Sequence, residues 1–417
     1  MAAPMVAVTV SQYLLQVVSM MMVGHIGKLS FSAVAIATSF AEVTGFSVLL
    51  GMAGALETLC GQTYGAEEFR KLGNYTCCAI ITLMLVCVPI SMVWIFMDRI
   101  LLLFGQDPQI SDAARIYCIF LIPALFGYAV LQSLVRYLQT QSMMFPMVLS
   151  SIAVLCLHMP VCWILVFRLG LGHVGAALAI GISYWFNVIG LGLYVKYSSA
   201  CEKTQIVFST NALLSIKEFF QLAIPSGLMF CLNTTTLHYF IPYGIGAAAS
   251  TRVSNELGAG NPKTARKAGS VAMVVGIAEA VVMNTALFFS GHVLGYAYSN
   301  EKEVVDYVAQ MVPFLCLSVI ADSLVGVLSG IARGGGFQQV GAYVNLGAYY
   351  LVGVPIALVL GFSVHLRAKG LWIGILTGSI VQAIVLAVVT AFTDWQKEAT
   401  KARERVTKKS IKGCNGV

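Results

Sequence analysis

The chain has 417 residues, of which 58% are apolar and only 10% are charged, and its mean hydropathy is +0.84. Soluble domains average about 25% charged residues, so this composition excludes a soluble enzyme or nucleic-acid-binding domain despite the formal charge of +7. Because a helix needs about 20 mostly apolar residues to cross a bilayer, the recurring apolar segments predict an all-α, polytopic membrane protein.

The predicted membrane segments follow one another almost from end to end, with short polar loops between them. The first lacks a basic leading region and a small-residue cleavage site, so we expect a retained span rather than a signal peptide. The first set lies near 3–23, 31–60, 76–97, 116–138, 147–167 and 174–196. The second set lies near 219–249, 268–290, 307–329, 340–362 and 370–392.

The lysines and arginines are concentrated in alternate loops. Most of the 25 lie after the second, fourth and sixth segments, in the corresponding loops of the second set, and in the C-terminal tail. Cytoplasmic loops of membrane proteins are enriched in these residues. We therefore expect these loops and the tail to be cytoplasmic, with 219–249 beginning and ending on one side.

An internal duplication is the main organisational signal. Five residues recur at one constant offset further along the chain, four of them identical and one as a similar amide: Gly51, Thr58, Gln62, Gly65 and Ala66 match Gly244, Thr251, Asn255, Gly258 and Ala259. Two halves of six spans keep the same orientation, as in transporters whose repeats share an axis along the membrane normal and handle substrate between them. A duplication can also serve only to build a stable bundle.

The duplication predicts four regions. They are an N-lobe repeat at 1–196, an interlobe cytoplasmic loop at 197–218, a C-lobe repeat at 219–392 and a basic cytoplasmic tail at 393–417.

The second half is shorter than the first. Pro4 and Pro225 open the two halves, and the offset between them is larger than the offset of the motif pairs downstream. The difference is about 28 residues, enough for one helix and a loop, so a piece of this length is absent near 232, between Cys231 and Asn233. We predict about 11 membrane segments in this chain, where two complete six-span halves would give 12.

Several motifs resemble those of multidrug and toxic compound extrusion (MATE) proteins. Residues 56–66 resemble the loop after the second helix of that family, and residues 250–262 resemble its counterpart after the eighth. Residues 136–141, 330–334 and 369–374 are similar to the plant detoxification branch. The resemblance covers nearly the whole chain, and within it Glu57, Gln62, Arg252 and Asn255 are the motif residues.

The resemblance implies a twelve-helix, two-lobed antiporter, not an enzyme, in the plasma or vacuolar membrane. Such a protein exports small organic compounds, often cations or glycosides, in exchange for protons. In the family, the piece absent near 232 is most of the seventh helix, including its acidic coupling residue. A shortened isoform that associates with its full-length relative without transporting is therefore an alternative, and a lipid-linked saccharide flippase of the same architecture is a third.

Carboxylates inside apolar segments are functional candidates because a buried charge is costly in a bilayer. Asp322 lies mid-span without a basic residue one turn away, and it matches the acidic position on the family's tenth helix that is implicated in proton coupling. Glu279 is a second proton-coupling candidate or a satisfied interhelical contact. Glu57 is expected to be an interlobe latch or helix-end partner, and Glu42 fits either a functional or a structural role.

Amide and phenol groups on the predicted spans suit planar organic substrates, through stacking and cation–π contact. They serve equally as interhelical hydrogen-bonding groups. The predicted substrate-cavity residues are Gln12, Tyr184, Asn187, Tyr343, Asn345, Tyr349 and Gln382. The 11 cysteines show no metal or redox spacing, and we expect neither a metal nor a cofactor.

Overall fold

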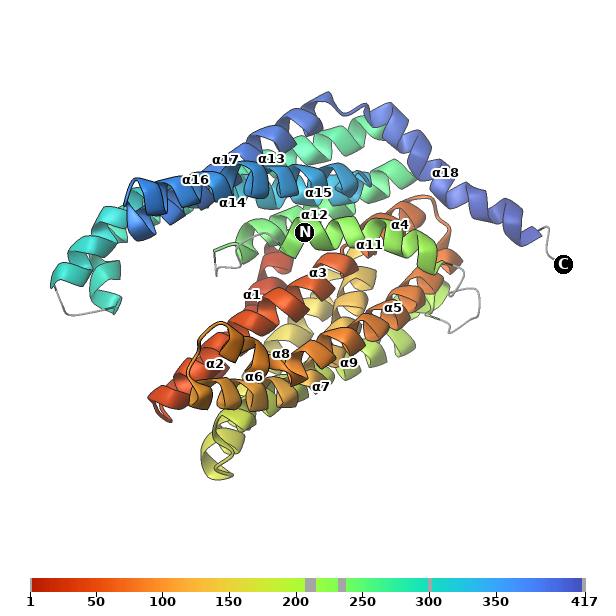
Figure 1. The fold of residues 1–417 in the computed structure, drawn as a ribbon. Coiled ribbons are helices and arrows are strands. Elements are labelled where there is room, and N and C mark those ends of the chain that lie inside the picture. Colours follow the sequence, from red (N-terminus) through yellow and green to blue (C-terminus); the bar gives the residue numbers. More distant parts are fainter. Residues whose placement is uncertain (1, 207–214, 232–237, 299–301, 415–417) are drawn as a thin grey trace.

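A computed structural model describes residues 2–206, 215–231, 238–298 and 302–414. Within these residues the chain is helical throughout and contains no strand. Two helical bundles, the N-lobe and the C-lobe, meet around α4, α11 and α12 and separate toward their opposite ends (Figure 1).

The N-lobe is built from the first half of the chain. Its elements in order are α1 (Ala2–Gly24), α2 (Lys28–Ala41), η1 (Glu42–Phe46), α3 (Ser47–Ala53), α4 (Ala55–Gly65), α5 (Phe69–Ile95), α6 (Met97–Leu103), α7 (Pro108–Thr140), α8 (Met144–Trp163), η2 (Ile164–Arg168), α9 (Gly172–Tyr197) and η3 (Ser199–Thr204).

The C-lobe and the tail follow. Their elements in order are α11 (Ile216–Cys231), α12 (Phe240–Gly258), α13 (Pro262–Tyr298), α14 (Lys302–Gly335), α15 (Gln338–Leu346), η4 (Gly347–Gly353), α16 (Val354–Leu358), η5 (Val359–Ser363), α17 (Arg367–Phe392) and α18 (Trp395–Cys414).

Ten helices or continuous helical runs among the described residues are long and apolar enough to cross a membrane. They correspond to ten of the segments predicted from the sequence. Their outward faces carry exposed apolar side chains such as Leu85, Met92 and Phe288. Apolar side chains on the outer surface are expected for membrane helices, because their backbone hydrogen bonds are satisfied internally and their surface contacts lipid.

The predicted segment 219–249 is not a single span. It divides into α11 and α12, and residues 232–237, where we place the deletion, lie outside the described residues. The start of α11 is beside α5, because the Tyr75 hydroxyl donates to Glu218 Oε2 at 3.1 Å. The end of α12 also lies at this side, where Asn255 contacts Gly65 at the end of α4.

The other ends of α11 and α12 lie deeper between the lobes. Ser226 of α11 packs against Gly54, and Thr9 of α1 donates to the Phe240 carbonyl oxygen at 3.1 Å. The two helices thus enter and leave on the same side, like a re-entrant hairpin. This geometry keeps the basic loops of both halves on one face, since the hairpin adds no crossing.

One pair of helix irregularities follows the duplication. The wide turns η2 and η5 are separated by the same offset that relates Gly175 to Gly370. Gly175 packs against the backbone of Leu165 in η2, and Gly370 packs against Leu360 in η5, which are equivalent positions. Structural equivalence therefore extends from the motifs to the local backbone.

Helices α4 and α12 meet through residues that are equivalent in the two halves. Gly65 contacts the backbone of Asn255, and Gly258 contacts the backbone of Gln62, which is the same contact with the halves exchanged. Gly61 contacts Ser254, which is its own equivalent in the second half. Such reciprocal contacts define a two-fold relation, so a pseudo-two-fold axis passes between these helices.

This close approach predicts the effect of one glycine substitution. A Cβ at Gly258 would collide with the Gln62 carbonyl oxygen, so Gly258→Val separates the lobes at an overpacking cost of about 1–3 kcal/mol. We expect a reporter Gln62→Cys to react with maleimide at least about fivefold faster in this background. Gly192→Val is the control, because nothing lies within 4 Å of its Cβ. Equal labelling in both variants would contradict the tight axis.

Candidate functional sites in the two lobes

A buried carboxylate joins the two lobes close to the axis. Glu57, in the first turn of α4, is fully buried; its Oε1 lies 3.1 Å from Nη1 of Arg136 on α7, and its Oε2 accepts from Nε of Arg333 on α14 at 2.9 Å. We call Glu57, Arg136 and Arg333 the interlobe triad. Arg136 belongs to the N-lobe and Arg333 to the C-lobe, so the triad bridges the lobe interface.

The triad carries one negative and two positive charges, and its surroundings compensate the excess. Both guanidinium groups lie over the ring of Tyr243, at 5.6 and 5.3 Å from its centroid, and Arg136 also donates to the Tyr243 hydroxyl and to Gln139 Oε1. Cation–π contacts are strongest where water is excluded. Removing one partner of a buried ion pair is costly, because the remaining charge stays buried.

The other motif residues lie around the triad. Asn255 donates to the Thr140 carbonyl oxygen at 3.1 Å and so joins α12 to the end of α7. Gln62 accepts from Nη1 of Arg405 on the tail helix α18 at 3.2 Å. Arg252, in contrast, is half exposed and pairs with Glu256 within its own helix at 2.8 Å.

The tail helix α18 contacts both lobes on this face. Arg405 also donates to the Gly336 carbonyl oxygen of the C-lobe at 3.3 Å, and Lys71 of the N-lobe donates to the Val406 carbonyl oxygen. Burial lowers the pKa of the Arg405 guanidinium, against the opposing effect of Glu398 and Glu218. The side that carries the basic loops is therefore closed by α4, α12 and α18 together.

The C-lobe contains a second group of polar residues in its interior. Glu279 on α13 lies 3.0 Å from Nε2 of His238 through Oε1, and its Oε2 accepts from the Ser323 hydroxyl at 2.8 Å. Asp322 precedes Ser323 on α14 and lies within electrostatic range of His238 and Tyr349. No basic side chain of the described residues forms an ion pair with Asp322. The two predicted coupling carboxylates are thus brought to neighbouring positions.

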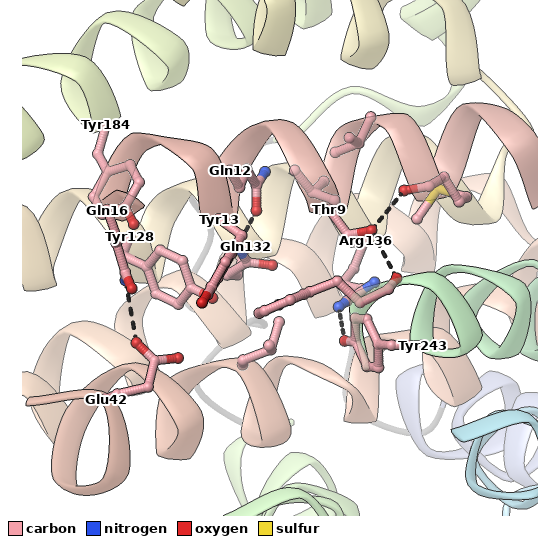
Figure 2. A pocket seen from close by; sticks show the side chains of 15 residues that line it. Thr9, Gln12, Tyr13, Gln16, Glu42, Tyr128, Gln132, Arg136, Tyr184 and Tyr243 are labelled. Atoms are coloured by element: carbon pink, nitrogen blue, oxygen red, sulfur yellow. Dashed lines mark hydrogen bonds between the residues drawn. The ribbon is translucent and has the colours of Figure 1, made fainter. Parts of the chain in front are cut away.

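The N-lobe contains a polar pocket that begins at Glu42 and ends at Arg136 (Figure 2). Glu42 lies in the wide turn η1, and its Oε2 accepts from Gln16 Nε2 at 3.1 Å. Insertions of this kind in a helix are frequent at functional sites. The residues around the pocket are Met5, Val8, Thr9, Gln12, Tyr13, Gln16, Glu42, Leu50, Tyr128, Gln132, Val135, Arg136, Tyr184, Phe240 and Tyr243.

The predicted substrate-cavity residues do not form one site. Gln12 and Tyr184 line the N-lobe pocket. Asn187 accepts from the Ser150 hydroxyl at 2.6 Å and joins α8 to α9, whereas Tyr349 bonds Ser379 in the C-lobe at 2.8 Å. Tyr343 is 74% exposed and lies at the surface of the C-lobe.

Two further predicted cavity residues, Asn345 and Gln382, are fully buried in the C-lobe. Gln382 has no hydrogen-bond partner for either side-chain atom in the described part of the chain.

Sequence reasoning missed several residues of these sites. His238, Tyr243 and Gln132 lie inside apolar segments, and this polar-in-apolar signal is the same one that singled out Asp322. Arg136 also lies inside a predicted span, 116–138, but nothing in the sequence pairs it or Arg333 with Glu57, because the three residues are far apart along the chain.

The comparisons agree with the geometry of two repeated lobes. The MatE family model matches residues 4–164 and again residues 226–359. The chain belongs to the MatE family. The second matched stretch is shorter than the first, in line with the shortened second half.

Among curated relatives of this MatE chain, Protein DETOXIFICATION 9 of Arabidopsis thaliana is 50% identical over 435 residues, covering 97% of this chain and 90% of the relative. Protein DETOXIFICATION 8 of the same organism is 51% identical with the same coverage. The crystal structure of the eukaryotic MATE transporter AtDTX14 matches with a TM-score of 0.95 and 50% identity, covering 97% of each chain.

The outward-facing structure of a multidrug resistance MATE family transporter matches with a TM-score of 0.82 and 16% identity, covering 97% of this chain and 95% of that one, which shows a shared fold. Membership in the MatE family makes the present chain a multi-pass membrane transporter of the multidrug and xenobiotic efflux class, not an enzyme.

The interlobe triad gives a testable stability difference. Glu57→Gln leaves two arginines buried without their carboxylate, and we expect it to destabilise the folded protein by about 3–5 kcal/mol. Glu256→Gln removes the half-exposed pair with Arg252 and should cost less than about 1 kcal/mol. Thermal unfolding of both purified variants in detergent measures the difference, and equal melting temperatures would contradict the role of the triad.

Proposed function

We propose that this MatE transporter is a proton-coupled antiporter that exports organic compounds. The observation that carries the proposal is the C-lobe group in which Asp322 lies beside the Glu279–His238 pair. A carboxyl in the bilayer interior without a cationic partner can bind and release a proton during a transport cycle. One proton crossing supplies about 2.3 kcal/mol per 100 mV and about 1.36 kcal/mol per pH unit.

Helix α14 gives this group a mechanical connection to the lobe interface. Asp322 and Arg333 are separated on α14 by about 16 Å, which is close to three full helical turns. They therefore lie on the same face of the helix. A change in charge at Asp322 that shifts α14 also displaces Arg333 relative to Glu57. Protonation of Asp322 and the contact between the lobes therefore act on the same helix.

The direction of coupling follows from the charges. With Asp322 ionised, the C-lobe interior holds a carboxylate that an organic cation or hydrogen-bonding substrate can contact. Protonation removes that charge and weakens such contacts, which favours release. Protons that enter from the more acidic side thus expel substrate on that side, which is the sense required of an exporter.

The main alternative is a shortened isoform that associates with the full-length transporter and does not itself transport. It is favoured by the second family match, which is shorter than the first, and by α11, whose 16 described residues are fewer than the about 20 that a crossing needs. The flippase receives less support, since Arg136 and Arg333 of the interlobe triad are both paired with Glu57.

Asp322→Asn tests the coupling. In a chain that carries the segment of Protein DETOXIFICATION 9 inserted between Cys231 and Asn233, we expect the variant to lose efflux driven by a pH gradient, because the titrating group is gone. Asp112→Asn, at an exposed surface ion pair, is the matched control and should retain it. Dye efflux from proteoliposomes measures both, and pH-driven efflux that persists in Asp322→Asn would refute the assignment.

The 417-residue chain should itself transport poorly. With only α11 and α12 in place of two spans, we expect reconstituted efflux well below that of the version with the inserted segment. Proteoliposomes that contain equal amounts of each protein provide the measurement. Comparable rates would show that the hairpin suffices and would remove the argument for a non-transporting isoform.

A further inference from the structure

A groove on the outer surface lies between α12 and α13 of the C-lobe, beside the start of α1. It holds about 370 Å³, and most of its lining is alanine, valine and isoleucine. Val271 and Val275 of its α13 wall are 55% and 41% exposed, so the groove opens outward, where a membrane protein contacts lipid. Ala2 of α1 also lines it, so a molecule in the groove contacts both lobes.

The spacing of the lining residues explains the shape of the groove. Positions three and four apart share one face of a helix, and this spacing relates the residues of the α12 wall, which are Ile245, Ala248, Ala249 and Arg252. The residues of the α13 wall follow the same spacing from Lys267 to Val275, which spans about 12 Å. The groove therefore has an apolar floor along the two helices and a cationic end.

The cationic end lies on the side that carries the basic loops. Arg252 is about 9 Å before the end of α12, and Lys267 is about 8 Å after the start of α13. Arg252 pairs with Glu256 at 2.8 Å, whereas Lys267 is exposed and forms no ion pair within the described residues. No acidic side chain lines the groove. Its end is thus positively charged at the depth of the lipid head groups.

This combination of charge and apolar floor is not a general property of the surface. Two other apolar grooves, one beside Met21 and Trp163 and one beside Phe120, are lined by no lysine or arginine. The duplication does not account for the cations either, because the equivalent positions in the first half are Leu59 and Asn74. The two cations therefore distinguish this groove from a surface that only contacts bulk lipid.

We propose that the groove is a binding site for an anionic phospholipid of the leaflet on the basic side. The phosphate lies at Arg252 and Lys267, and one acyl chain follows the apolar floor. Basic pockets between membrane helices on the cytoplasmic side bind anionic head groups in this way. The site gives a role to Arg252, the motif residue that takes no part in the lobe interface. It does not depend on the transported compound or on proton coupling.

Phosphatidylglycerol and phosphatidylcholine with the same two oleoyl chains provide a matched test, because their head groups differ in net charge. Native mass spectrometry of the purified full chain, titrated with each lipid in neutral detergent, measures the affinity of the first bound lipid. We expect the wild type to prefer phosphatidylglycerol at least about tenfold, since each cation contributes about fivefold and Glu256 offsets a part. Lys267→Gln should lower this preference about fivefold, and the double variant Arg252→Gln/Lys267→Gln should abolish it.

Lys196→Gln is the control and should retain the preference, since this exposed lysine lies at the end of α9, outside the groove. The ratio of the two affinities is internal to each variant, so a partial loss of folded protein does not change it. Equal affinities in the wild type, or an unchanged ratio in the double variant, would overturn the proposal.

Two further measurements test the apolar floor. Ala268→Leu adds bulk to the floor and keeps both cations, so it should weaken the binding of phosphatidylglycerol about fivefold or more. Glycerol phosphate carries the charge without the acyl chains and should not displace the bound lipid at equal concentration. Displacement by glycerol phosphate, or unchanged affinity in Ala268→Leu, would show that the cations bind free phosphate and that the groove is not a lipid site.

Discussion

The contact of one buried carboxylate with two arginines constrains the whole molecule. Glu57 is the only negative charge in the interlobe triad, so Arg136 and Arg333 share it across the lobe boundary. If the lobes separate, water must reach all three charged groups at once, because an unpaired charge is costly to keep in a dry interior. The close glycine contacts of α4 with α12 keep water out while the lobes are together.

The two halves share a backbone plan but differ in their charged side chains. The position equivalent to Glu57 in the second half is Ser250, so the triad has no symmetric copy. Glu42 belongs to the N-lobe, whereas Asp322, Glu279 and His238 lie in the C-lobe. Duplication thus supplied two similar scaffolds around an axis, and later divergence gave each scaffold its own polar interior.

Hydropathy and the repeat predicted about 11 spans, ten of which correspond to apolar helices of the described structure, and the motifs predicted the family, because each is a property of segments. Pairings between distant residues could not be predicted in this way. Nothing near Glu57 in the sequence indicates that Arg333 reaches it, and the predicted cavity residues, chosen by residue type, scatter over several places. Asn187 and Tyr343 show why: an amide or phenol on a span serves a helix contact or the surface as readily as a cavity.

The tail helix α18 also joins the two lobes, through contacts that differ in kind from those of the interlobe triad. Arg405 and Lys71 connect it to both lobes through side chains that are only partly shielded from water. Such bonds weaken as dissolved ions accumulate, whereas a fully buried pair is hardly affected. The contacts of α18 with the two lobes should therefore loosen as the salt concentration of the surrounding fluid rises, while the buried triad stays unchanged.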